Sequence, residues 1–218
     1  MGLPKAVNGS ELTTPDAAPD AITYNAYPQE DGSMLVTVEA GTGVWWNYKL
    51  IKTADAAEPS VLAGTWYMSL ADGSLGVGPS EFDGSWWSND ASVTDTRACY
   101  FDDAFVFGEY GSFDNELQDL TWVEGWQGGS DSCAAPVAPH DGSANARFNY
   151  DADAQTLTIS GRGAYLGIPK PVNGAELTAP EEAPESITYN AYLNDDGTMD
   201  VTVEAGTGVW WNYVLVKD

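Results

Sequence analysis

The sequence predicts an all-β protein: an antiparallel β-sandwich of the jelly-roll kind, or a β-barrel, built as one module of a tandem repeat. Short segments in which apolar and polar residues alternate are separated by turns rich in Gly and Asp. No segment of useful length has the 3.6-residue periodicity of a helix. A long stretch of sequence also occurs twice, which points to a repeated structural unit.

The repeat defines the expected domain organisation. Residues 2–52 (the first copy) and 167–217 (the second copy) align without a gap at an offset of 167 − 2 = 165, and 36 of the 51 aligned positions are identical. This period is too long for a solenoid unit and suits a domain. We therefore expect 60–218 to be one complete β module and 1–52 to be the C-terminal third of a preceding repeat. Residues 53–59 are small, acidic and Pro-ended, as is typical of a linker.

Each expected strand follows from its alternation and its flanking turns. In the second copy, a turn at 194–197 (Asn-Asp-Asp-Gly) predicts a hairpin between two alternating segments, and Asp31-Gly32 marks the same hairpin in the first copy. In chain order, strands are expected at 22–27, 34–39, 44–51, 61–70, 99–107, 120–126, 146–150, 156–161, 187–192, 199–204 and 209–216.

The charge is strongly one-sided. Eight Lys and Arg against 33 Asp and Glu give a net charge of −25. Such a chain repels phosphate backbones, so nucleic acid is excluded as a partner. Membrane insertion is not expected either, because the sequence has no run of 18 apolar residues. The acidity is interpreted as adaptation to a marine or saline extracellular setting or as calcium binding; alternatively, it only keeps a Trp-rich repeat protein soluble.

The two cysteines, Cys99 and Cys133, are predicted to form a disulfide, because an even cysteine count in a strand-rich chain is typical of secreted proteins. Closing a loop of this size would contribute roughly 3 kcal/mol in the chain-entropy description. The alternative is a pair of buried free thiols. The disulfide prediction places the protein outside the cell, secreted or at the cell surface.

The last expected strand contains a candidate sugar-binding pair. Alternation puts Trp211, Tyr213 and Leu215 on one face, which we assign to the core, and Trp210 and Asn212 on the other. An exposed indole beside an amide suits a pyranose ring, whose C–H face stacks on the indole while its hydroxyls bond the amide. The alternative is a central strand covered on both faces.

Two further Trp clusters are candidate ligand-binding sites. Trp86 and Trp87 lie among turn-forming residues, and a Trp pair in a polar loop is costly unless it packs or binds something. Trp122, Glu124 and Trp126 share one face by alternation, and two indoles flanking a carboxylate resemble a sugar cleft. The same pattern equally describes an ordinary core with a hydrogen-bonded Glu.

Catalysis is not expected. Glu124 with Asp119 or Asp103 could form a carboxylate pair, but among 33 acidic residues some pair always has suitable spacing. His140 is the single histidine and lies in a turn sequence, and no Gly-x-Ser-x-Gly motif is present.

No cofactor is expected, with one exception that the sequence leaves open. Paired acids could supply oxygen ligands to a structural Ca²⁺, although such acids more often cap turns. These pairs are Asp102 with Asp103, Asp151 with Asp153, and Asp195 with Asp196.

The pattern GTW…LGVGPSEFDGSWWSNDASVTDTRACYFDDAFVFGEYGSFDNELQDLTWVEGWQ…CAAPVAPHDGS…GRGAYLGIPK…GTGVWWNYVLVK, within residues 62–217, resembles repeat modules of large secreted and surface proteins of marine Bacteroidetes. It is similar to accessory modules attached to laminarinase-type glycoside hydrolases. The resemblance implies a non-catalytic module that binds β-glucan, or a spacer in a giant adhesin. The Glu-x-Asp-x-x-Glu signature of laminarinases is absent, which favours the accessory role.

Two functions remain open at this point. The first is an extracellular carbohydrate-binding module that binds a neutral, β-glucan-like polysaccharide weakly through exposed Trp. The second is a structural repeat of a large cell-surface adhesin or filament protein. For either, we expect contacts with neighbouring repeats and strand-swapped self-association of the first copy, whose edges would otherwise be unpaired.

Overall fold

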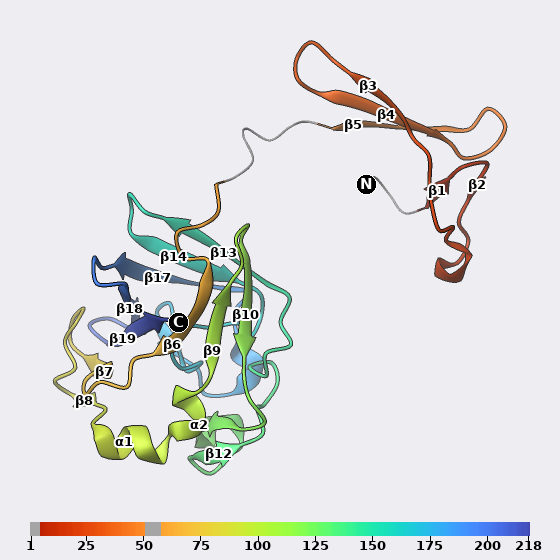
Figure 1. The fold of residues 1–218 in the computed structure, drawn as a ribbon. Helices are drawn as coiled ribbons and strands as arrows, with labels where there is room; N and C mark the ends of the chain where they lie inside the picture. The colour runs from red at the N-terminus through yellow and green to blue at the C-terminus, as the bar shows by residue number, and fades with distance from the viewer. Residues whose placement is uncertain (1–4, 51–57) are drawn as a thin grey trace. The chain divides into compact units, whose positions relative to one another are not determined.

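The computed structural model describes residues 5–50 and 58–218 (Figure 1). The chain divides into two compact units, residues 1–57 and 58–218. Most of the expected linker at 53–59, namely 53–57, lies outside the described residues. No helix among the described residues is long and apolar enough to cross a membrane.

The larger unit is a closed antiparallel barrel of eight strands. Its strands, in order around the barrel, are β18 (Thr198–Glu204), β17 (Ser186–Leu193), β14 (Thr156–Ser160), β13 (Ala146–Asp151), β10 (Ser112–Glu116), β9 (Ala104–Phe107), β6 (Gly64–Met68) and β19 (Trp210–Lys217). Pairing of β19 with β18 closes the circle. The all-β prediction is therefore confirmed, and of the two expected architectures the barrel is the one that forms.

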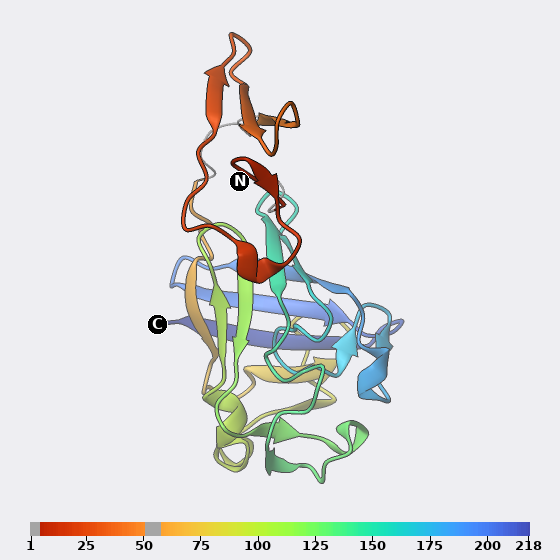
Figure 2. The same cartoon turned by 90° about the vertical axis from the view of Figure 1, so that its right-hand side faces the viewer.

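Strand β19 has three partners because it is long. Along its whole length it pairs with β18, while on its other edge the first half pairs with β7 (Leu75–Gly78) and the second half with β6. A short strand, β8 (Trp87–Ser88), extends the sheet beyond β7. In Figure 2 the long strands β17, β18 and β19 are drawn in blue and lie side by side in the barrel wall.

The barrel interior is filled by alternate side chains, as expected for eight strands. Aromatic side chains dominate it, and edge-on ring contacts join Phe107 to Phe113 and to Phe148. In β19 the buried residues are Trp211, Tyr213 and Leu215, so the predicted core face of this strand is confirmed.

Two short helices correct the prediction of strand throughout. α1 (Ala91–Thr96) begins where the Asp90 carboxylate accepts hydrogen bonds from the Ser92 and Val93 N–H groups. α2 (Ala98–Phe101) occupies the start of the strand expected at 99–107, and only its second half, β9, is extended. Helices of one or two turns are too short for periodicity to reveal them.

The strand expected at 120–126 is also shorter than predicted. β11 (Thr121–Val123) ends before the 3₁₀ turn η2 (Gly125–Gln127), because the Gln127 side chain accepts a hydrogen bond from the Glu124 N–H. β11 pairs only with β12 (Ser132–Ala134).

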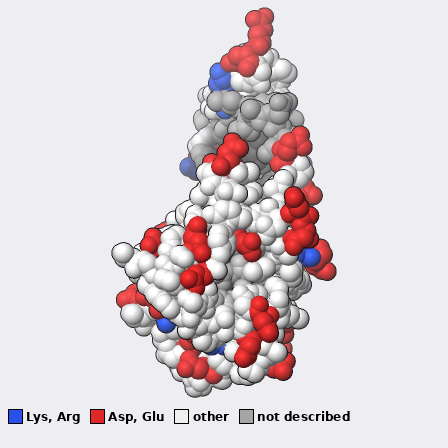
Figure 3. Space-filling model, turned by 90° about the vertical axis from the view of Figure 1, so that its left-hand side faces the viewer, with Lys and Arg blue, Asp and Glu red and all other residues white. Residues whose placement is uncertain are grey.

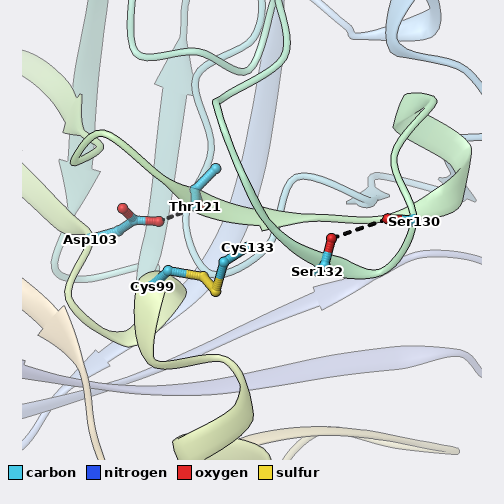
Figure 4. The surroundings of a disulfide bond; sticks show 6 residues. All are labelled: Cys99, Asp103, Thr121, Ser130, Ser132 and Cys133. Atoms are coloured by element: carbon cyan, nitrogen blue, oxygen red, sulfur yellow. Dashed lines mark hydrogen bonds between the residues drawn. A yellow bond between two sulfur atoms is a disulfide. The ribbon is translucent and has the colours of Figure 1, made fainter.

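The predicted disulfide is confirmed: Cys99 of α2 is bonded to Cys133 of β12 (Figure 4). Two three-residue strands form a marginal hairpin by themselves. The disulfide anchors this hairpin to the helix, and the hydrogen bond from the Thr121 hydroxyl to Asp103 Oδ2 (2.5 Å) adds a second anchor (Figure 4).

The smaller unit is a three-stranded antiparallel sheet with a short hairpin. The sheet order is β3 (Asn25–Pro28), β4 (Met34–Glu39), β5 (Trp45–Leu50), and the hairpin is β1 (Ala6–Val7) with β2 (Ser10–Glu11), followed by the 3₁₀ turn η1 (Pro15–Ala17). The second copy has the equivalent elements in the same order: β15 (Pro171–Val172), β16 (Ala175–Glu176), η3 (Pro180–Glu182), then β17, β18 and β19. β17 is the longer counterpart of β3 and begins four residues earlier in the alignment.

Side-chain hydrogen bonds are reproduced between the copies. Trp46 Nε1 donates to Glu11 Oε1 (2.9 Å), and 165 residues later Trp211 Nε1 donates to Glu176 Oε1 (2.8 Å). The ion pair of Lys5 with Glu11 (2.9 Å) recurs between the equivalent lysine and Glu176 (3.1 Å). The repeated sequence thus encodes the same local structure in both copies.

Candidate ligand-binding face

One loop, residues 79–86 between β7 and β8, is fastened to the outer surface of the barrel. Asn212, which alternation places on the outer face of β19, both accepts a hydrogen bond from this loop and donates one to it. The Phe82 N–H donates to Asn212 Oδ1 (2.7 Å), and Asn212 Nδ2 donates to the Asp83 carbonyl oxygen (3.0 Å). We call residues 79–86 the outer-face loop.

Glu81 is the second anchor of this loop. Its carboxylate accepts hydrogen bonds from Asn190 Nδ2, from the Thr202 hydroxyl (2.8 Å) and from the Tyr192 hydroxyl (3.5 Å). These donors come from β17 and β18, so one carboxylate ties the loop to two strands. Partial burial and the neighbouring Glu81 charge raise the pKa of Tyr192, which keeps its hydroxyl protonated as a donor.

The anchored loop presents two aromatic side chains to solvent. Phe82 is 58% exposed and Trp86 is 57% exposed. Phe82 lies edge-on to Tyr192 (ring centroids 5.3 Å apart) and has a positive φ of 61°, which is rare for a bulky residue. A conformation of this kind costs on the order of 1 kcal/mol or more and persists only where the surroundings impose it.

The predicted pair on β19 belongs to this same face. Trp210 is half-buried and lies on the side of β19 that carries Asn212. The Asn212 amide is engaged by the loop backbone and by the Trp210 carbonyl oxygen (3.4 Å). The structure therefore makes Asn212 a positioning residue for the loop and leaves the aromatic rings as the groups available for contact.

The other residue of the loop pair, Trp87, turns toward a different cluster. It is half-buried and packs against the core. The Arg97 guanidinium lies 5.4 Å from the Trp87 ring centroid and 4.6 Å from that of Trp122. The structure thus separates Trp86 from Trp87 and joins Trp87 to Trp122 through a shared cation.

The expected sugar cleft at residues 122–126 has a packed geometry. Trp122 and Trp126 are half-buried against the core, and Trp126 Nε1 donates to Glu124 Oε2 (2.8 Å). The Trp126 ring also contacts His140 edge-on, with centroids 5.6 Å apart. In this arrangement Trp122 and Trp126 pack against the core and Glu124 accepts a hydrogen bond, which was the alternative to a sugar cleft in the sequence analysis.

Asp103 and His140 are buried ionisable side chains of the larger unit. Burial raises the pKa of Asp103 to about 7, against the opposing effect of hydrogen bonds from Thr121 and the Gln118 backbone. Burial lowers the pKa of His140 to about 4. Both shifts favour the neutral form at the site, as expected where a side chain leaves water without an ionic partner.

The candidate calcium ligands do not converge in the part of the chain that the structure describes. No group of three or more His, Cys, Asp or Glu side chains there could hold a metal ion. Asp151 and Asp196 instead accept hydrogen bonds from backbone N–H groups of their own turns. Figure 3 shows acidic side chains scattered over the drawn face with few basic ones between them.

No family model, curated protein or solved structure matches this chain.

Several residues of the outer-face loop escaped the sequence analysis. Glu81 and Phe82 lie five and four residues before Trp86, but the anchoring strands lie more than a hundred positions away in the chain. The alternation of β17 places Asn190 and Tyr192 on its outer side, and this pattern was the one sequence feature that could have indicated a contact there. Arg97 gave no signal, because its contacts depend on α1 and α2, which were not predicted.

Proposed function

We propose that the protein is a non-catalytic extracellular carbohydrate-binding module that binds a neutral, β-glucan-like polysaccharide weakly. The contact surface is the outer-face loop with the adjoining part of β19: Phe82, Trp86 and Trp210. The observation that carries this proposal is the exposure of Phe82 and Trp86 on a loop that is itself rigidly held by Glu81 and Asn212.

Rigid exposed rings suit sugar binding for a thermodynamic reason. An aromatic side chain gives a large apolar contact surface, and fixing it in advance avoids the entropy cost of ordering it upon binding. A neutral polysaccharide also avoids repulsion from the net charge of −25. With so few stacking contacts we expect a Kd of about 10–1000 μM, which several linked modules would strengthen through avidity.

Affinity electrophoresis in gels containing laminarin tests the proposal. We expect the wild type to be retarded, and Trp86→Ala to weaken binding about tenfold, which corresponds to about 1.4 kcal/mol. Tyr110→Ala is the matched control, because Tyr110 is at least as exposed (64%) but lies in the turn between β9 and β10. Absence of retardation of the wild type, or equal effects of the two substitutions, would contradict the proposal.

The second candidate, a structural repeat of a cell-surface adhesin or filament, is favoured by a different observation. The two copies share 36 of 51 residues and the same internal hydrogen bonds, as expected where a module is repeated for length. If the protein has this second function, neither Trp86→Ala nor Tyr110→Ala should change its migration in the laminarin gel.

A further inference from the structure

The sheet of the first copy has an inward face that matches the inside of the barrel. Nine positions of the second copy point into the barrel from the β17 segment, β18 and β19, and all nine carry the same residue type in the first copy. In the first copy they are Ile22, Tyr24, Ala26, Met34, Val36, Val38, Trp46, Tyr48 and Leu50. The strand positions that differ, such as Leu35 against Asp200 and Lys49 against Val214, point outward.

This face is fully covered in the second copy and only partly covered in the first, where Val36 and Val38 are buried. In the second copy Ala191, Met199 and Leu215 are completely buried. Their counterparts differ: Ala26 is exposed, and Met34 and Leu50 are half-buried. In the larger unit the covering segment is residues 58–166, which we call the half-barrel.

The contacts between the half-barrel and the second copy are specific, and the first copy has the partners for them. At one edge β14 pairs with β17, and at the other β6 and β7 pair with β19. On the outside, Asn190, Tyr192 and Thr202 bind Glu81, and Asn212 binds the outer-face loop. The equivalent residues of the first copy have the same side chains: Asn25, Tyr27, Thr37 and Asn47.

We propose that residues 5–50 are a docking element for the half-barrel of a second copy of this chain. The inward-facing residues and the outer hydrogen-bonding side chains match those of the second copy, whereas at the β14 edge the first copy is extended only over β3. In each chain the half-barrel is filled by residues 167–217, so docking requires a half-barrel whose own second copy is displaced or disabled. This interaction is independent of glycan binding and joins copies by completing a barrel.

Mixing full-length variants tests the proposal. The recipient is Ala26→Glu/Ala191→Glu, in which both copies carry a charge at a position that the barrel buries, where an unpaired charge is strongly unfavourable. Its half-barrel is therefore unfilled. It is refolded from denaturant, with the disulfide kept, together with an equal amount of wild-type chain, and the mixture is analysed by native mass spectrometry and light scattering.

We expect a one-to-one complex of twice the 23.3 kDa chain mass with wild type. Leu35→Asp should form the same complex, because it adds an acid on the outward side that the second copy tolerates as Asp200. Ala26→Glu should form none. A second set of variants alters another inward position: its recipient is Leu50→Glu/Leu215→Glu and its altered partner is Leu50→Glu. If the whole inward face is used, this recipient should also form a complex with wild type and none with Leu50→Glu.

Other results would overturn the proposal. One is the absence of a complex with wild type in both sets, including aggregation of the recipient that wild type does not prevent. Another is equal binding to Ala26→Glu, because the inward face would then not be used. A recipient that folds alone as a monomer would also overturn the proposal. Its half-barrel would then be filled by its own chain despite the charge on the inward face.

Discussion

At the scale of single residues, burial sets the chemistry of Asp103. This side chain is 1% exposed, and its carboxyl group accepts a hydrogen bond from the Thr121 hydroxyl and has no ionic partner. The pKa of about 7 in the folded chain compares with 3.8 for an unperturbed Asp. The folded state therefore binds a proton more tightly than the unfolded state does.

The sign of the resulting pH dependence follows from linkage. The contribution of protonated Asp103 to the free energy of unfolding is complete below about pH 4. It is lost as the pH rises to about 7, because the folded protein must then ionise a buried carboxyl group. The span of about three pKa units corresponds to on the order of 4 kcal/mol. His140 acts in the opposite sense, since its lowered pKa of about 4 removes stability as pH falls below about 6.5.

We predict that Asp103→Asn removes the Asp103 part of this dependence. The free energy of unfolding of Asp103→Asn, relative to wild type, should rise between pH 4 and pH 8 by up to about 4 kcal/mol. Urea unfolding of both proteins across this range measures the difference. A difference that stays constant with pH, or falls, would show that Asp103 ionises normally in the folded chain.

At the scale of elements, the outer-face loop depends on a carboxylate that accepts three hydrogen bonds. Replacing Glu81 with Ala leaves Asn190, Tyr192 and Thr202 without this acceptor, and we expect a loss of about 1–3 kcal/mol in unfolding free energy. Backbone amides of residues 79–86 should exchange faster with deuterium, while amides of β13 and β14 should not change. Unaltered exchange in the loop would mean that Asn212 alone holds it.

Elements differed in how well the sequence predicted them. The hairpin of β17 and β18 was predicted correctly because its alternation and its Asn-Asp-Asp-Gly turn are local signals. α1 and η2 were missed because side chains that bond nearby backbone N–H groups set where they begin. α2 was missed because a helix of four residues is too short to show periodicity. Of the candidate site, turn-forming neighbours indicated Trp86 and strand alternation indicated Trp210, whereas Glu81 acts through partners distant in sequence.

At the scale of the whole molecule, the closed barrel explains the position of the glycan-binding surface that we propose. The long strand β19 commits its inner side to the core, with Trp211, Tyr213 and Leu215 buried, and its outer side to the loop through Asn212. The adjacent tryptophans 210 and 211 therefore have opposite roles, one at the surface and one in the barrel. Strand alternation alone predicted this division, but the closure of the barrel depends on pairings across the whole module.

The most direct test follows the indole N–H signals of the nine tryptophans by NMR during titration with soluble β-glucan oligosaccharides. Our account predicts that the Trp86 and Trp210 signals shift progressively, while Trp66, buried in the barrel with its N–H bonded to the Leu62 carbonyl, does not move. It would be contradicted if no indole signal shifted at millimolar oligosaccharide, or if only Trp122 and Trp126 responded.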